Sequence, residues 1–94
     1  MSEKFDLTRM REILENETYP SRYVQKVVGN NNDIFRGDLA VLEAKLTRVV
    51  RTGDRLGGSG KYLSVTYELH AQSPEEILEL MREVRALREV LFML

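Results

Sequence analysis

The sequence predicts an α+β fold in which two amphipathic helices lie on one face of a four-stranded antiparallel sheet. Segments with a helical repeat of apolar residues alternate with segments rich in β-branched and aromatic residues. The 94 residues are 43% apolar and 31% charged, which is enough for one packed domain under a charged surface. Without an internal repeat or linker in the pattern, we interpret residues 1–94 as a single domain.

The first predicted element is an additional amphipathic helix over about residues 6–16. Asp6 is a candidate N-cap, and Phe5 can pack against Met10 as a hydrophobic staple. The apolar stripe of this helix consists of Leu7, Met10, Ile13 and Leu14.

Residues 19–29 are rich in β-branched and aromatic side chains and predict the first strand. Alternation places Gln25 on one face and Lys26 on the other. A buried Gln can be satisfied by hydrogen bonds, whereas an unpaired buried Lys costs far more, so we expect Lys26 on the more open face. Residues 30–33 then form a turn that supplies a helix cap.

A second helix follows, but its end is ambiguous in the sequence. Its apolar stripe repeats at spacings of four, three, four and three, through Phe35, Leu39, Leu42, Leu46 and Val49. Residues 47–52 also alternate as a strand does, so the helix ends either near residue 46 or near residue 51. In the first case a second strand covers about residues 49–56, and residues 57–60 form a hairpin loop.

Residues 62–71 form the clearest predicted strand, with odd-numbered side chains toward a core and even-numbered ones toward water or a partner. A third helix starts at Ser73, with Pro74 at its first position and Glu76 closing a capping box. Its buried stripe is Ile77, Leu80, Met81, Val84 and Leu87. Residues 89–94 are predominantly apolar and predict a last strand.

After the first helix, the elements follow in the order β-α-β-β-α-β. Two interleaved right-handed crossovers with this order give a ferredoxin-like or ACT-like sandwich, here with an extra N-terminal helix.

Composition excludes several classes of protein. The formal net charge of −1 argues against a protein that grips nucleic-acid phosphates. The absence of Cys removes disulfides, thiolate metal sites and thiol nucleophiles, and favours a reducing cytoplasm. No apolar run reaches the length of a membrane span, and residues 1–4 hold no apolar signal core, so we expect no membrane association.

Two motifs resemble phosphate sites but depart from them. The glycines of residues 57–60 precede a strand, whereas a phosphate loop must open a helix to aim its amides. Gly29 and Arg36 flank the first strand-to-helix turn as in an acylphosphatase signature, but too many residues separate them. An acylphosphatase-like hydrolase therefore remains a minor alternative, and Arg36 is expected as a solvated charge.

A third motif, residues 60–67, resembles the third-strand motif of RNA-recognition domains, which stacks bases on two aromatic rings. Tyr62 occupies the first aromatic position, but Ser64 stands in the second. Binding of single-stranded RNA on the open sheet face is therefore an alternative function.

The sequence offers no catalytic constellation. His70 is the only His, so a zinc site or a Ser-His-Asp triad lacks its usual partners, and an exposed strand His is expected. The carboxylates of the last helix stand near Arg82, Arg85 and Arg88, as in ordinary surface pairing. We expect neither an enzyme nor a bound metal or cofactor.

The sheet face opposite the helices is expected to be partly apolar. It would show Val24, Lys26, Val28, Tyr62, Ser64, Thr66, Glu68 and His70, with Leu91 and Met93 from the last strand. We expect the apolar last strand to lie at an edge of the sheet. An apolar face and an unprotected edge strand favour a homodimer through this face or the last strand, or a partner laid across this face. In the competing interpretation, the N-terminal helix folds over the face and covers it.

Three blocks of the sequence, residues 19–29, 60–65 and 90–94, resemble the YbeD-like proteins, a bacterial family of unknown function. The resemblance implies the ACT-like fold and a helix that ends near Leu46. Some members carry a lipoate regulatory label, and the fold is similar to small-molecule-sensing domains of amino-acid metabolism. Family members often have a Ser pair where this chain has Gly57 and Gly58.

These observations predict a cytoplasmic regulatory or interaction module that binds a small metabolite or a protein partner. The candidate contact residues are Lys26, Gly29, Gly60 and Tyr62, because they belong to the motifs and because Lys26 and Tyr62 share one face.

Overall fold

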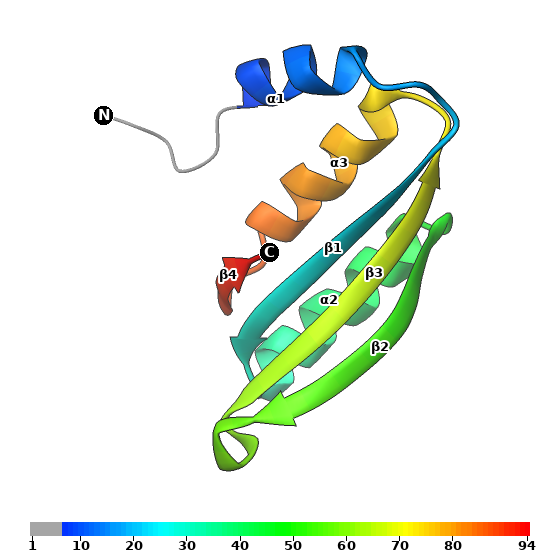
Figure 1. Cartoon of the computed structure of the whole chain (residues 1–94). Helices are drawn as coiled ribbons and strands as arrows, with labels where there is room; N and C mark the ends of the chain where they lie inside the picture. Colours follow the sequence, from blue (N-terminus) through cyan, green and yellow to red (C-terminus); the bar gives the residue numbers. More distant parts are fainter. Residues whose placement is uncertain (1–6) are drawn as a thin grey trace.

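The computed structural model describes residues 7–94, and Figure 1 shows the arrangement of their helices and strands. The elements are α1 (Leu7–Glu15), β1 (Ser21–Asn30), α2 (Asp33–Lys45), β2 (Val49–Gly57), the 3-10 turn η1 (Gly58–Gly60), β3 (Tyr62–Ala71), α3 (Pro74–Arg85) and β4 (Val90–Met93). The strands form one antiparallel sheet in the order β2-β3-β1-β4. The predicted α+β class and ferredoxin-like or ACT-like topology are confirmed. The expected Asp6 cap and Phe5 staple lie outside the described residues.

The central pair of the sheet is β1 and β3, which pair along their whole length from Ser21↔Ala71 to Asn30↔Tyr62. β2 lies outside β3, while β4 pairs with only the last part of β1. The two edges of the sheet are therefore β2 and β4, and the expected position of the last strand at an edge is confirmed.

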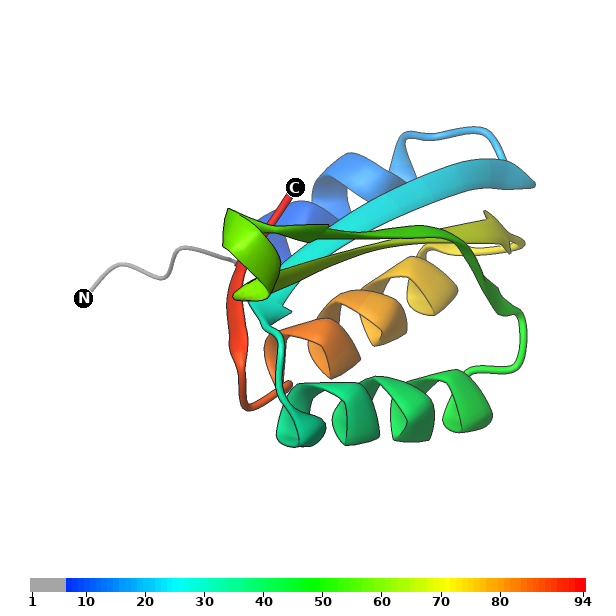
Figure 2. The same cartoon turned by 90° about the horizontal axis from the view of Figure 1, so that it is seen from below.

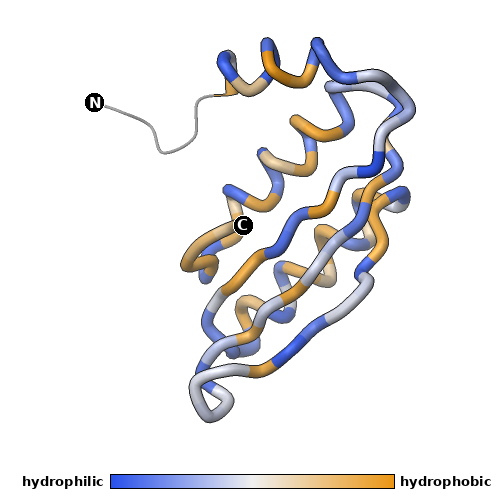
Figure 3. The backbone as a smooth tube through the Cα atoms, viewed as in Figure 1, coloured by the Kyte–Doolittle hydropathy of each residue, from blue (hydrophilic) through white to orange (hydrophobic). Residues whose placement is uncertain are grey.

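The hydrophobic core lies between the sheet and the two helices α2 and α3, which lie together on one face (Figure 2). Hydrophobic and hydrophilic residues alternate along β1 and β3 (Figure 3), so each strand gives one set of side chains to this core. In β3 the odd-numbered residues Leu63 to Ala71 are buried, as predicted. All residues of the buried stripe predicted for the third helix are buried, including Leu87 just after the end of α3. Leu78 is also buried, although the sequence pattern did not predict it.

Hydrogen bonds at the two ends of α2 account for where the helix begins and ends. The Asn32 side-chain oxygen accepts a hydrogen bond from the Phe35 N–H at 2.9 Å and caps the first turn. Leu46 is the C-cap, so the helix ends near residue 46 and Val49 begins β2.

The start of α3 differs from the predicted capping box. Ser73 is the N-cap with an extended backbone, but its hydroxyl makes no capping hydrogen bond. The Glu76 carboxylate reaches one residue further back and accepts from the Gln72 N–H at 3.1 Å. The start of α3 was predicted correctly, whereas the prediction of reciprocal capping hydrogen bonds between Ser73 and Glu76 was wrong.

Helix α1 packs beside α3 and not over the open side of the sheet. Leu14 is buried, and Leu7 and Met10 pack against the core. Arg11 pairs with Glu75 at the start of α3, where Figure 1 shows the two helices meeting. Ile13, which was predicted in the buried stripe, is instead exposed because it turns away from this contact.

The facing of β1 follows the cost of burying charge. Gln25 is 4% exposed and Lys26 is exposed, as predicted. The Gln25 amide is satisfied because it accepts from the Tyr23 hydroxyl at 2.6 Å and donates to the Leu94 carbonyl at 2.9 Å. Burial raises the pKa of Tyr23 to about 12, so this hydroxyl keeps its proton at neutral pH.

The facing predicted for Met93 in β4 was wrong. Met93 lies opposite Val27 and packs against the core, while Phe92 lies opposite the outward-facing Val28. Residues directly opposite in an antiparallel pair share a face, so Phe92 belongs to the open face. A register shift between Val28 and Gly29 displaces the pairing, and alternation within β4 alone does not reveal such a shift.

Candidate functional site

The sheet face that points away from α2 and α3 is called the open face. Residues of β1, β3 and β2 lie side by side across this face. In one row Lys26, Thr66 and Gly53 are register partners, and in the next row Val28, Ser64 and Arg55 are. Its members on these strands are Arg22, Val24, Lys26, Val28, Val50, Gly53, Arg55, Tyr62, Ser64, Thr66, Glu68 and His70.

A hollow of about 420 Å³ lies on this face and is called the open-face hollow. Lys26 and Tyr62, two of the four predicted contact residues, both line it. The full lining is Lys26, Val28, Gly53, Asp54, Arg55, Leu56, Gly57, Tyr62, Ser64 and Thr66. Each of these residues is exposed or half-buried, so the hollow is shallow.

The cations of the open-face hollow lack carboxylate partners. Within residues 7–94, neither Lys26 nor Arg55 takes part in an ion pair. Arg22 on the same face, in contrast, donates to Glu68 at 2.7 Å, and Glu68 also contacts His70 at 3.0 Å. The Arg22 guanidinium is the main cause that lowers the pKa of Glu68. The hollow thus offers two cations without an ion-pair partner to an incoming anion, while the one carboxylate in its lining, Asp54, pairs with Arg51.

The two predicted glycines serve the fold and do not line the hollow. A Cβ on Gly29 would lie 2.6 Å from the Phe35 ring and 2.8 Å from the Glu89 carbonyl oxygen, so only glycine allows this close packing. Gly60 has a φ of 92°, and its carbonyl accepts from the Asn31 amide at 2.8 Å. Gly29 lies near the end of β1 and Gly60 in the turn η1, and the motif resemblance alone made them contact candidates.

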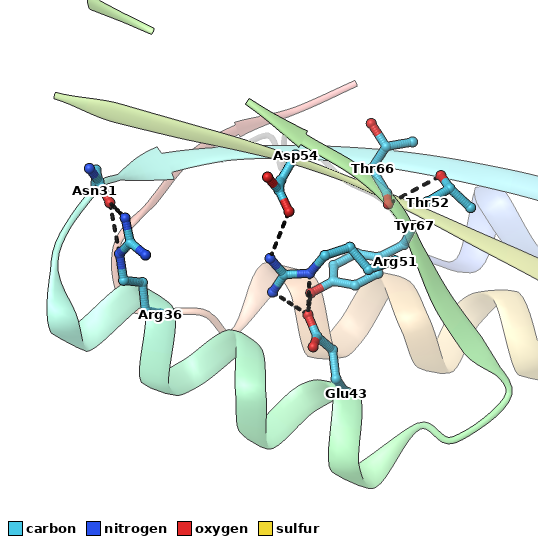
Figure 4. A network of polar contacts seen from close by, with 8 residues as sticks. All are labelled: Asn31, Arg36, Glu43, Arg51, Thr52, Asp54, Thr66 and Tyr67. Carbon is cyan, nitrogen blue, oxygen red and sulfur yellow. Dashed lines mark hydrogen bonds and ion pairs between the residues drawn. The ribbon is translucent and has the colours of Figure 1, made fainter. Parts of the chain in front are cut away.

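A polar network missed by the sequence analysis joins α2 to the sheet (Figure 4). The Glu43 carboxylate accepts from the buried Tyr67 hydroxyl and from Arg51, whose Nε lies 2.9 Å away. Arg51 also reaches Asp54 at 3.4 Å. Burial, reinforced by Glu43, raises the pKa of Tyr67, so its hydroxyl remains a donor. The network ties the helix to β2 and β3.

A crevice of about 350 Å³ adjoins this network between α2 and β2. Its lining is Arg36, Leu39, Arg51, Asp54, Leu56 and Leu63. Arg36 donates to the Asn31 side-chain oxygen from Nε at 2.9 Å and from Nη2 at 2.6 Å (Figure 4). Arg36 is exposed, as expected. Its two hydrogen bonds to Asn31 fix the guanidinium against the turn that precedes α2.

The carboxylates of α3 pair differently from the prediction. Glu76 pairs with Arg48 at 3.2 Å and Glu83 with Lys45 at 2.7 Å, so these ion pairs join α3 to its neighbours in space. His70 is exposed, as predicted. Within residues 7–94, the acidic and His side chains form no group of three that could hold a metal ion. None of the helices described has the length and apolar character to cross a membrane.

Over residues 7–94, the order of the elements and the sheet with α2 and α3 on one face define a small α+β sandwich of the ferredoxin-like or ACT-like kind. The chain belongs to the family described as protein of unknown function (DUF493), whose model matches residues 15–94. This match confirms the resemblance to the YbeD-like proteins. Neither the curated proteins nor the solved structures gave a match to the chain.

Proposed function

We propose that this protein is a non-catalytic interaction module of the bacterial cytoplasm that binds an acidic segment of a protein partner on its open face. The observation that supports the proposal is the pair of cations without ion-pair partners, Lys26 and Arg55, beside the exposed ring of Tyr62 in the open-face hollow.

The shape of the hollow favours a protein partner over a small metabolite. Sites for small molecules usually enclose about 70–90% of the ligand surface. Here no lining residue is buried and the hollow continues into the rest of the open face, so a small ligand would remain largely in water. A partner that spreads across β1, β2 and β3 would cover the face more completely.

The chemistry of the hollow favours an acidic partner. Two uncompensated cations attract carboxylates and speed their encounter. Ser64 and Thr66 add hydroxyls between Lys26 and Arg55 in the register, and Val28 and Tyr62 add apolar contact. These groups together suit a segment that carries Asp or Glu beside an apolar side chain.

An RNA strand also needs cations, so it is the competing outcome of the test. Along the outward side of β3, however, Tyr62 is followed by Ser64, so this strand offers one stacking ring where RNA-recognition motifs use two.

The test compares Arg55→Gln with Arg82→Gln, an equal change of charge on the exposed side of α3. The probe is a fluorescently labelled hexaglutamate peptide followed by anisotropy, with inorganic phosphate and a short uridine oligonucleotide as competitors. We expect Arg55→Gln and Lys26→Gln each to weaken peptide binding by about two- to fivefold, as for exposed charge pairs. We expect Arg82→Gln to leave it unchanged.

Equal loss in Arg55→Gln and Arg82→Gln would show that the attraction is not located in the hollow. Displacement by equimolar phosphate would instead assign the hollow to a small anion. Tighter binding of the oligonucleotide than of the peptide would replace the proposal by RNA binding.

A further inference from the structure

The open face changes in character from its β4 edge to its β2 edge. One row of register partners crosses all four strands and consists of Phe92, Val28, Ser64 and Arg55, in that order. The row therefore begins at an aromatic ring and ends at a guanidinium group. Neighbouring strands lie about 4.8 Å apart, so roughly 14 Å separate the two ends of the row. A partner that binds across the row meets an apolar region and a cationic region.

Apolar side chains gather at the β4 edge of the open face. They are called the apolar strip, and its members are Val24, Val28, Phe92 and Leu94. Leu94 belongs to the strip because it exchanges both backbone hydrogen bonds with the outward-facing Lys26, at 3.2 and 2.8 Å, and directly opposite residues share a face. Val24 is 42%, Phe92 50% and Leu94 71% exposed. Apolar side chains grouped on one exposed face mark a contact surface.

The two cations of the open-face hollow lie beside the apolar strip. Lys26 stands between Val24 and Val28 on the outward side of β1. Long Lys side chains cover apolar neighbours with their methylene groups while the ammonium group stays in water. Arg55 lies at the far end of the row, and neither cation has an ion-pair partner within residues 7–94. An occupant that is complementary to both regions carries an apolar stripe with acidic side chains along one border.

The backbone of such an occupant also has to be satisfied. Hydrogen bonds between strands lie in the plane of the sheet, so the sheet offers no backbone partner to a chain that lies on its face. An extended segment laid there would leave its own N–H and C=O groups without partners where water is excluded, which is costly. An α-helix pairs these groups within itself, and its diameter of about 10–12 Å is close to the span of the row.

We propose that the partner segment is an amphipathic α-helix that lies on the open face, with its apolar stripe on the apolar strip and its acidic border toward Lys26 and Arg55. This inference rests on the proposed function, because it specifies the form of the acidic segment that binds there. In such a helix, apolar residues at positions i, i+3, i+4 and i+7 form the stripe. Acidic residues at i+1 and i+8 lie along one border of that stripe, at about 100° per residue.

The first test uses two labelled peptides of identical composition, each of about 18 residues, or five helical turns. The stripe peptide carries Leu along one stripe, Glu along one border of it, and Ala and Gln elsewhere, whereas the scrambled peptide has the same residues without a stripe. Fluorescence anisotropy should show the stripe peptide binding about tenfold more tightly or better, because only it can bury a continuous apolar surface. Circular dichroism should show that the stripe peptide gains helix when it binds.

The second test changes the apolar strip without changing charge. Phe92→Thr should weaken binding of the stripe peptide about threefold or more, and Val24→Thr, which keeps a β-branched side chain, about twofold. Both should leave the binding of hexaglutamate unchanged, since they spare the two cations. Val41→Thr on α2, where Val41 is 66% exposed, is the control and should affect neither ligand. Circular dichroism of the unbound variants checks that each of them folds.

The outcomes separate this inference from the proposed function. Equal affinity for the two peptides, while hexaglutamate binding still falls in Arg55→Gln, would overturn the helix and leave the acidic contact intact. Equal losses in Phe92→Thr and Val41→Thr would also overturn the helix. If hexaglutamate binding does not respond to Arg55→Gln, the proposed function fails and this inference fails with it. A dimer of the unbound protein that Phe92→Thr dissociates in sedimentation velocity would assign the apolar strip to a second copy and overturn the inference.

Discussion

The two faces of β3 show how one strand serves both stability and contact. Val65 and Tyr67 are completely buried against the helices, whereas Thr66 and Glu68 between them stay half-buried on the open face. Adjacent residues therefore experience different environments, since side chains alternate across a strand. The buried apolar side chains that stabilise the fold lie on the helix side of the strand. The open side contributes little to this core, so it can carry polar and charged side chains such as Glu68.

The largest expected effect is on the helix side of this comparison. Leu39→Ala, at a fully buried position, should lower the free energy of unfolding by about 2–5 kcal/mol because it opens a cavity. Val24→Ala, on the open face and 42% exposed, should change it by less than about 1 kcal/mol. Urea denaturation measures both, and similar losses would mean that the open face is covered in solution.

Gly29 sharpens the comparison because it lies where the sheet meets α2. Gly29→Ala should destabilise the protein by about 1–3 kcal/mol, since its Cβ would collide with the Phe35 ring and the Glu89 carbonyl. Gly53→Ala is the control, because an added Cβ there meets no atom within 4 Å. Thermal unfolding should separate the two variants, and a neutral Gly29→Ala would remove the packing explanation for this glycine.

Tyr67 tests the polar network on the buried side. Tyr67→Phe keeps the ring but removes the hydrogen bond to Glu43, so it should cost about 0.5–1.5 kcal/mol of unfolding free energy. Tyr62→Phe on the open face is the matched control and should be neutral in denaturant titration. A neutral Tyr67→Phe would show that Arg51 alone satisfies Glu43.

The smallest effect concerns pH and the turns that flank the sheet. Hydrogen bonds from Asn30 and Asn32 lower the pKa of Glu89, and Arg88 lowers the pKa of Asp38. A carboxyl whose pKa is lower in the folded state stabilises the protein fully above its unfolded pKa. Stability should therefore be retained down to about pH 4.5, the ordinary value for Glu, and then fall on further acidification. Glu89→Gln should flatten part of this acid slope, and an unchanged slope would contradict the assignment.

Local chemistry predicted most of the fold, because each decisive feature lay within a few residues. The different costs of burying Gln25 and Lys26 predicted which side chains of β1 face the core. The Asn residues after this strand predicted the cap of α2. Features that depend on pairing across the fold were missed. The register shift that turns Met93 inward and the bond between Tyr67 and Glu43 join segments far apart in sequence, which no local pattern encodes.

The candidate site was predicted only in part for the same reason. Lys26 and Tyr62 were selected as residues of one face, and the structure places both in the open-face hollow. Arg55 was not selected, because its place beside Ser64 follows from the shift in the β2–β3 register between Arg51 and Gly53.

The most direct test of the open face as the contact surface is a map of backbone amide chemical shifts during addition of hexaglutamate. We predict that the largest changes fall on Lys26, Arg55 and Thr66, and that the buried side of the same strands changes little. The largest changes on the exposed cations of α2 and α3, such as Arg36 and Arg82, would contradict the account.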